Sequence, residues 1–123
     1  MSHTVFISYS NQDKAIAERI CATIENNNIS CWIASRDVQA GSNYGASIIE
    51  AINHSRIMVL ILSNSSNQSE QVVREVERAV SKGITILPFR IEEVKLSNSL
   101  EYFLSTHQWL DAFPNLLNSH INV

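Results

Sequence analysis

An uninterrupted apolar run, Ile57–Leu62, constrains the fold of this chain more than any other feature. A strand that meets solvent on one face alternates apolar and polar residues, whereas a strand buried on both faces is apolar throughout. Strands of the second kind occur in parallel sheets that carry helices on both sides. The run is also far shorter than the roughly 20 residues of a membrane-spanning helix. The sequence therefore predicts a central buried strand of an α/β protein.

The rest of the chain alternates strand-like runs with amphipathic helical stretches, and no linker divides it. Strands are expected at Thr4–Ser8, Ile29–Ile33, Arg56–Leu62, Thr85–Phe89 and His107–Leu110. Helices are expected from Asp13 to the Asn26-Asn27-Asn28 run, from Asn43 to His54, across Val72–Val80 with Gly83 as the C-terminal glycine, from Ser97 to Leu104, and from Pro114. Pro88 has no N–H to donate and should lie at a strand end or sheet edge. This alternation predicts a doubly wound parallel sheet.

Composition narrows the functional classes. The chain has 123 residues, 45% of them hydrophobic and 17% charged, which is typical of one folded globular domain. The net charge of −3, with Arg74, Arg78 and Lys82 interleaved with acids, argues against nucleic-acid binding. Cys21 and Cys31 lack metal-ligand spacing and indicate buried, reduced thiols. With no secretory signal pattern, we expect a cytoplasmic protein without metal, membrane or nucleic-acid partners.

Polar segments follow the first three predicted strands, at Ser8–Ser10, Ala34–Ser42 and Ser63–Ser69. The carboxyl ends of parallel strands meet at one edge of the sheet, where ligands bind. Glu75 lies about one turn into the helix after the third of these segments and could face a substrate there. The pattern alone favours a plainer interpretation, a solvated glutamate paired with Arg78.

Five segments, in this order, resemble the sequence boxes of Toll/interleukin-1 receptor (TIR) domains, most closely bacterial ones. They are Val5–Ser10 with Asp13-Lys14, Cys31–Gly41, Ser69–Glu75, Leu87–Arg90 and His107–Leu110. The resemblance implies a flavodoxin-like, five-stranded, doubly wound α/β domain with helices on both faces, spanning residues 1–123. Because a last helix would barely begin before the chain stops, we expect a domain cut from a longer protein.

The family has two functional branches. Some TIR domains are adaptors that assemble into filaments or signalling platforms, and others cleave the nicotinamide–ribose bond of NAD⁺. Glu75, six residues after Ser69, matches the catalytic glutamate of the second branch. A carboxylate near the ribose can bind its hydroxyls and stabilise the positive charge that develops as the bond breaks. NAD⁺ would be a substrate, and no metal or cofactor is required.

The resemblance also suggests residues that contact the substrate, namely Ser8, Tyr9, Ser10, Trp32, Arg36, Asp37, Tyr44 and Ser69. Several of these residues have an alternative role. Ser69 can cap the helix, with Asn67 as a rival cap, and Trp32 can pack in the core. Arg36 and Asp37 can contact a neighbouring subunit or form a surface ion pair. His54 and His107 are interpreted as structural.

One departure from the family concerns Gln71 and Val72, where many NAD-cleaving members carry Trp-Cys. Another aromatic, from this chain or a neighbouring one, would have to stack on nicotinamide. The expected function is an NAD⁺ nucleosidase or cyclase, activated by self-association with other TIR domains and coupled to a sensor domain, in bacterial antiphage defence or signalling. The alternative is a non-catalytic adaptor that acts through TIR–TIR assembly.

Overall fold

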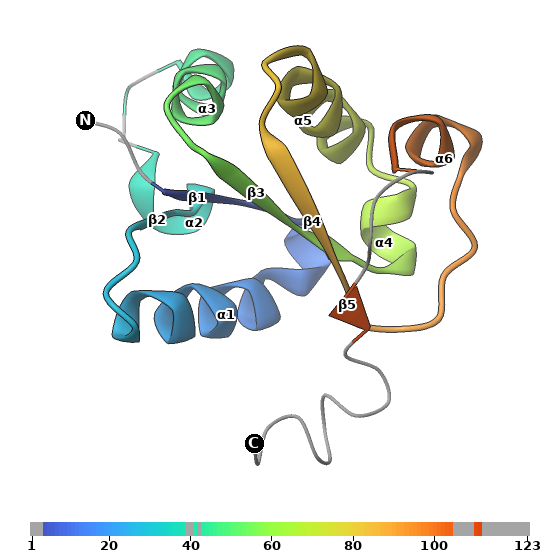
Figure 1. Cartoon of the computed structure of the whole chain (residues 1–123), viewed down its shortest axis with the longest axis horizontal. Helices are drawn as coiled ribbons and strands as arrows, with labels where there is room; N and C mark the ends of the chain where they lie inside the picture. Colours follow the sequence, from blue (N-terminus) through green and yellow to red (C-terminus); the bar gives the residue numbers. More distant parts are fainter. Residues whose placement is uncertain (1–3, 39–40, 42, 105–109, 112–123) are drawn as a thin grey trace.

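The computed structural model describes residues 4–38, 41, 43–104 and 110–111 as parallel strands flanked by helices (Figure 1). In chain order the elements are β1 (Val5–Ser8), η1 (Asn11–Asp13), α1 (Lys14–Asn26), β2 (Cys31–Trp32), α2 (Ala34–Asp37), α3 (Tyr44–Asn53), β3 (Ile57–Leu62), α4 (Asn64–Asn67), α5 (Glu70–Ser81), β4 (Thr85–Arg90), α6 (Asn98–Leu104) and β5 (Leu110–Asp111). Within these ranges, every helix falls short of the length and hydrophobicity that crossing a bilayer requires.

The strands lie in the order β2-β1-β3-β4-β5, and every pair is parallel. The chain leaves β1 for one edge of the sheet and returns to its other side at β3, which places a topological switch point between β1 and β3. The prediction of a parallel α/β sheet is confirmed. Most of the strand expected at His107–Leu110 lies outside the described residues; the described part of the last strand, β5, is Leu110–Asp111. The helix expected from Pro114 lies wholly outside them.

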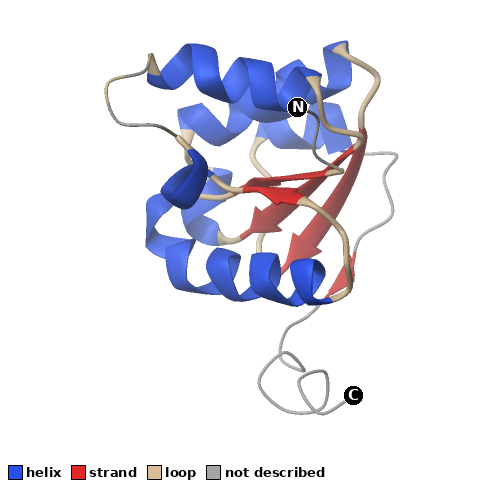
Figure 2. Ribbon diagram, turned by 90° about the vertical axis from the view of Figure 1, so that its left-hand side faces the viewer, coloured by secondary structure: helices blue, strands red, loops and turns tan. Residues whose placement is uncertain are grey.

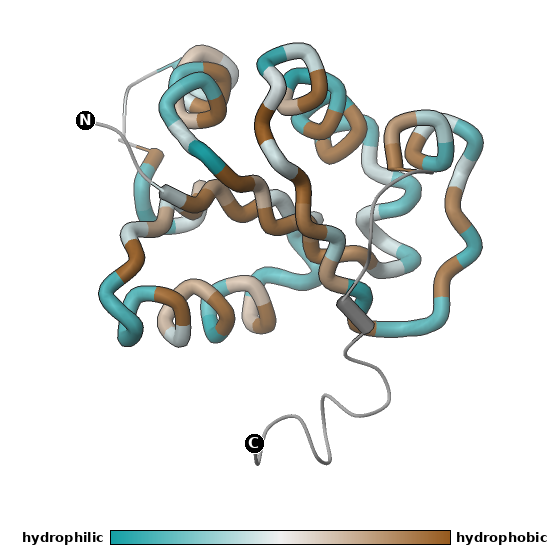
Figure 3. The backbone as a smooth tube through the Cα atoms, viewed as in Figure 1, coloured by the Kyte–Doolittle hydropathy of each residue, from teal (hydrophilic) through white to brown (hydrophobic). Residues whose placement is uncertain are grey.

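Two apolar layers cover the sheet, one on each face. Alternate residues of β3 enter different layers: Met58, Leu60 and Leu62 pack with α3, α5 and α6, and the intervening Val59 and Ile61 pack with α1. Figure 2 shows the helices on both sides of the strands, and Figure 3 shows the hydrophobic residues concentrated along them. An uninterrupted apolar run is therefore what this central position requires.

Two predictions about local structure are wrong. The second strand was expected at Ile29–Ile33, but β2 spans only Cys31–Trp32; it ends there because Ile33 becomes the N-cap of α2, its N–H donating to Asp37 Oδ2 at 2.9 Å. The polar segment after β3 was expected to be a loop, but it contains α4. There the hydroxyls of Ser63 and Ser66 each accept a backbone N–H of the other residue, which closes a capping box.

The ends of α5 agree with the sequence. Ser69 is its N-cap and accepts the N–H of Val72 at 3.2 Å. The rival cap, Asn67, instead accepts the N–H of Ser97 and donates to the carbonyl of Lys95. Gly83 follows the helix with a φ of +72°, a conformation that favours glycine.

Pro88 lies inside β4, opposite Leu60, rather than at a strand end. The N–H of Ile91 donates to the carbonyl of Leu62, and successive N–H groups of a strand point to opposite sides. Residue 88 therefore faces away from β3, toward the side where the described part of β5 pairs with Phe89 and Arg90. The missing N–H removes no hydrogen bond between β3 and β4.

The two-sided burial of β3 predicts the effect of a core truncation. Leu60 is 0% exposed and Leu87, in the adjacent strand, is 38% exposed. We expect Leu60→Ala to lower the free energy of unfolding by about 2–5 kcal/mol, and Leu87→Ala to lower it much less. Urea denaturation of both variants measures the difference. Equal losses would contradict the placement of β3 at the centre of the sheet.

Candidate functional site

Glu75 lies on the buried side of α5, a position that an apolar residue would ordinarily occupy. Its neighbours on that side, Val72, Val76 and Ala79, are almost fully buried in the core. The Glu75 side chain is itself only 7% exposed, and it lies beside Ser8 at the carboxyl end of β1. The helix thus places a carboxylate at the strand-end edge of the sheet, where α/β proteins bind ligands.

Both oxygens of the Glu75 carboxylate accept hydrogen bonds from neutral groups. The Ser8 hydroxyl donates to Oε1 at 2.7 Å, and Gln71 Nε2 donates to Oε2 at 3.2 Å. Gln71 is one helical turn before Glu75, which brings their side chains together. The same Gln71 nitrogen also donates to the hydroxyl of Tyr44 on α3, at 3.2 Å. The carboxylate is therefore oriented by groups from β1 and α5, with α3 supporting one of them.

Burial raises the pKa of Glu75 from its ordinary value of 4.5 to about 7, against the opposing effect of the hydrogen bonds from Ser8 and Gln71. Among the described residues, no ion pair involves Glu75. Arg78, its expected surface partner, instead donates from Nε to Asn53 Oδ1 at 3.2 Å. A desolvated carboxylate with neutral partners is stabilised by a cationic ligand.

Two cavities meet at Glu75. The first, which we call the strand-end crevice, encloses about 70 Å³. Its lining consists of Phe6, Ile7, Tyr9, Ser10, Asn11, Ala34, Tyr44, Ser69, Gln71 and Glu75. The second, the α3–α5 groove, encloses about 510 Å³ and is lined by Tyr44, Gly45, Ile48, Ile49, Ile52, Gln71, Arg74, Glu75, Glu77, Arg78 and Ser81. Tyr44, Gln71 and Glu75 belong to both linings, so the two cavities adjoin at the carboxylate.

A cluster of hydroxyls around Asp13 holds the segment after β1, and the sequence did not reveal it. The hydroxyls of Ser10 and Ser63 both donate to Asp13 Oδ2, the first at 3.0 Å. Ser10 also lies 2.7 Å from the hydroxyl of Ser65 in α4. These contacts join the carboxyl ends of β1 and β3, and they fix one wall of the strand-end crevice.

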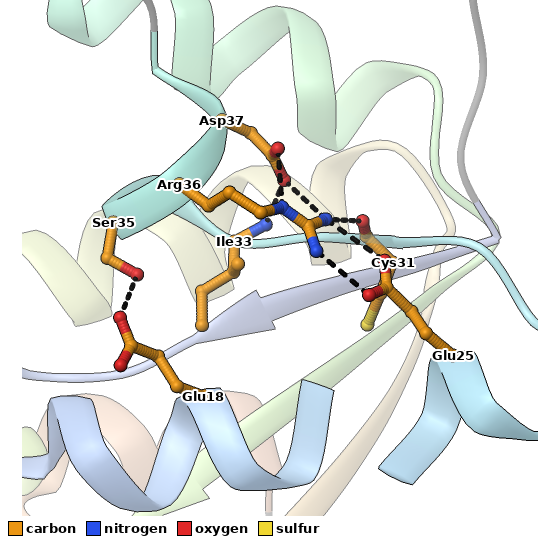
Figure 4. A network of polar contacts seen from close by, with 7 residues as sticks. All are labelled: Glu18, Glu25, Cys31, Ile33, Ser35, Arg36 and Asp37. Carbon is orange, nitrogen blue, oxygen red and sulfur yellow. Dashed lines mark hydrogen bonds and ion pairs between the residues drawn. The ribbon is translucent and has the colours of Figure 1, made fainter. Parts of the chain in front are cut away.

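Arg36 and Asp37, both expected to contact substrate, belong to a network on the α1 side (Figure 4). The Arg36 guanidinium donates to both carboxylate oxygens of Glu25, at 2.8 and 3.0 Å, to the Cys31 carbonyl at 2.8 Å, and to Asp37. Ser35 donates to Glu18 at 2.8 Å. The network fastens α2 to α1, and neither Arg36 nor Asp37 lines the crevice or the groove.

The aromatic candidates divide between core and site. Trp32 is 7% exposed and stacks on Phe6, with ring centroids 5.1 Å apart and planes 9° from parallel. It belongs to the core layer rather than to either cavity lining. Tyr9 and Tyr44 line the crevice, and Tyr44 is 48% exposed. With the almost fully buried Phe6, these two tyrosines are the aromatic residues in the described lining of the crevice.

Of the remaining residues that the sequence singled out, Cys21, Cys31 and His54 lie outside both cavity linings. Cys21 and Cys31 are buried, unbridged thiols, and burial raises the pKa of both, that of Cys31 to about 12. Such thiols are poor nucleophiles and poor metal ligands. No group of side chains suited to a metal ion occurs in the described part of the chain. Nδ1 of His54 donates to the carbonyl of Glu50 at 2.8 Å at the end of α3, and His107 lies outside the described residues.

The buried carboxylate predicts a pH-dependent cost in stability. Because folding raises the pKa of Glu75, its contribution to stability is present below the unfolded pKa and lost as pH rises toward 7. Between about pH 5 and pH 8, the wild type should lose about 2–3 kcal/mol of unfolding free energy relative to Glu75→Gln. Urea denaturation at both pH values measures this. Glu50→Gln, at an exposed site on α3, is the control, and parallel pH dependence of Glu75→Gln and wild type would contradict the burial.

Comparison with known proteins identifies the family. A family model described as TIR domain matches residues 5–120. A search of curated proteins finds none that matches this chain.

Solved structures show the same fold at low sequence identity. The TIR domain of the Toll-related receptor TRR-2 from Hydra magnipapillata is 19% identical, with a TM-score of 0.78 over 99% of this chain and 100% of that one. A metazoan TIR-STING receptor from C. gigas is 27% identical, with a TM-score of 0.70 over 83% of this chain; the match spans 36% of the receptor chain. The TIR domains of the activated Roq1 resistosome are 14% identical, with a TM-score of 0.69 over 98% of this chain and 76% of that one. With the family model matching nearly the whole sequence, the chain belongs to the TIR domain family.

Proposed function

We propose that this TIR domain cleaves the nicotinamide–ribose bond of NAD⁺, with Glu75 as the catalytic residue. The observation that supports the proposal best is the position of Glu75: a buried carboxylate at the strand-end edge, held by Ser8 and Gln71. Its hydrogen-bond partners are neutral and its side chain is largely shielded from solvent, and in such surroundings charge–charge interactions are stronger than in water. The carboxylate is therefore suited to a substrate that carries positive charge.

The chemistry requires little beyond this group. In NAD⁺ the positive charge resides on the pyridinium ring. When the C1′–N bond breaks, its electron pair leaves with nicotinamide, and the charge moves to an oxocarbenium-like ribose. A carboxylate near C1′ stabilises that charge and can accept hydrogen bonds from the ribose hydroxyls. Water then adds to C1′ and loses a proton to give ADP-ribose, or an adenine nitrogen adds to give a cyclic isomer.

The pKa of Glu75 near 7 fits this role. A carboxylate with a raised pKa gains more from a nearby cation than one already stabilised by a salt bridge. Binding of the cationic substrate would therefore favour the ionised form. In the unliganded protein, protonation of Glu75 should lower activity at pH values below about 7.

Activity should depend on Glu75 and on pH. Concentrated or artificially clustered protein should convert NAD⁺ to nicotinamide, and chromatography of the reaction mixture measures this conversion. Glu75→Gln should lower kcat by at least about a hundredfold, whereas Glu50→Gln should retain activity. kcat/KM should rise as pH increases through about 7, because the carboxylate is the active form. If Glu75→Gln keeps full activity, Glu75 is not the catalytic residue. If the clustered wild type leaves NAD⁺ intact, the proposed enzymatic function is wrong.

Activation by self-association with other TIR domains is part of the proposal, as is a sensor domain elsewhere in a longer protein. The Roq1 relative is a resistosome, an assembly that contains TIR domains. In an assembly, a neighbouring copy would add further walls to the strand-end crevice, which encloses about 70 Å³ in one copy. A role in bacterial antiphage defence or signalling would follow from regulated consumption of NAD⁺.

A non-catalytic adaptor is the second candidate. Gln71 and Val72 favour it, because they stand where many NAD-cleaving members carry Trp-Cys. An adaptor would assemble with rising concentration, as light scattering would show, while NAD⁺ in the same sample stays intact.

A further inference from the structure

The size of the two cavities bears on how a ligand reaches Glu75. The strand-end crevice encloses about 70 Å³, which is well below the volume of an ordinary ligand site. Small-molecule sites usually enclose about 300–1,000 Å³, a range that includes the 510 Å³ of the α3–α5 groove. Because Tyr44, Gln71 and Glu75 line both cavities, the groove ends at the carboxylate. The larger part of a ligand that reaches Glu75 therefore fits the groove rather than the crevice.

The groove offers apolar surface from α3 and positive charge from α5. On the α3 side, Ile48 and Ile52 are buried and Ile49 is 45% exposed, which gives apolar contacts for a base or a sugar face. On the α5 side are Arg74 and Arg78, one helical turn apart. Side-by-side guanidinium groups bind phosphate oxygens through charge-assisted hydrogen bonds.

Toward the described residues, both arginines use only part of their hydrogen-bonding capacity. The ion pair of Arg74 with Glu70 is long, 3.6 Å, between side chains 75% and 89% exposed, and exposed pairs of this kind are weak. Arg78 donates from Nε to Asn53, which uses one of its five N–H groups. Arg36, by contrast, directs its guanidinium to Glu25, Asp37 and the Cys31 carbonyl.

We propose that the α3–α5 groove holds the phosphate-bearing part of a pyridine dinucleotide, with Arg74 and Arg78 binding the pyrophosphate and the nicotinamide ribose at Glu75. This assignment rests on the proposed cleavage of NAD⁺. Arg78 is three residues beyond Glu75, about 4.5 Å along the helix axis, so the two side chains can contact adjoining parts of one ligand. Glu77, on the same wall, is suited to accept hydrogen bonds from the hydroxyls of the adenosine ribose.

Binding of two related ligands tests the assignment. In a Glu75→Gln background, which prevents turnover, calorimetry would compare NAD⁺ with nicotinamide riboside, which lacks the pyrophosphate. The double variant Arg74→Gln/Arg78→Gln should weaken NAD⁺ binding by roughly tenfold or more and leave riboside binding unchanged. Arg19→Gln, on α1 and therefore on the other face of the sheet, is the matched control and should change neither.

Isotope-labelled isoleucine methyl groups give a second measurement. NAD⁺ should shift the methyl resonances of Ile48 and Ile49. The assignment is overturned if the double variant binds NAD⁺ like its parent, if it loses both ligands equally, if these methyl groups do not respond, or if the parent binds no NAD⁺.

The outcomes separate this assignment from the proposed catalysis. If the protein cleaves NAD⁺ and the double variant has the same KM as its parent, the groove is not the pyrophosphate site, while Glu75 stays the catalytic residue. If NAD⁺ binding depends on the two arginines but the clustered wild type cleaves no NAD⁺, the groove assignment is supported and the proposed enzymatic function is wrong.

Discussion

The burial of β3 on both faces is the constraint from which the rest of the structure follows. A strand that is apolar on both sides needs a layer of helices above and below the sheet, and here α1 covers one side while α3, α5 and α6 cover the other. Parallel strands joined through such helices place every strand-to-helix connection at the same edge. Polar residues that cannot enter the core gather there. The position of the site is thus a consequence of how the hydrophobic residues are arranged.

Glu75 departs from that arrangement. The buried face of α5 is otherwise apolar, and a carboxylate in it is ionised only against the cost of desolvation. Two neutral donors reduce this cost without removing it, as the raised pKa shows. A group that destabilises the unliganded fold when charged, and that a cationic ligand would stabilise, is typical of a functional position rather than a structural one.

Local sequence patterns predicted what depends on neighbours along the chain. The apolar run of β3, the Ser69 cap and the Gly83 terminus all follow from residues within one or two turns of each other. The bond from Ser8 to Glu75 joins residues 67 positions apart, and no periodicity specifies such a partner. The same limit applies to Arg36: sequence showed a charged residue after a strand, but only the fold shows that Glu25 and the Cys31 carbonyl occupy its donors. The short helices α2 and α4 were missed because each is only four residues long, too short for apolar spacing to reveal it.

Gln71 shows how one substitution relative to the family pattern can alter a site in several ways. An indole would present a large apolar face and a single N–H, whereas the glutamine amide donates to Tyr44 and Glu75 from one nitrogen. The glutamine side chain offers no aromatic ring on which a base could stack. In return it orients the carboxylate, and it takes up less space where the groove meets Glu75. In the proposed binding mode, recognition of the dinucleotide would depend less on stacking from position 71 and more on Tyr44 and the two arginines of α5. Under the proposed mechanism the absent tryptophan is not essential, because a carboxylate at position 75 would act on the charge of the transition state and not on the ring of the base.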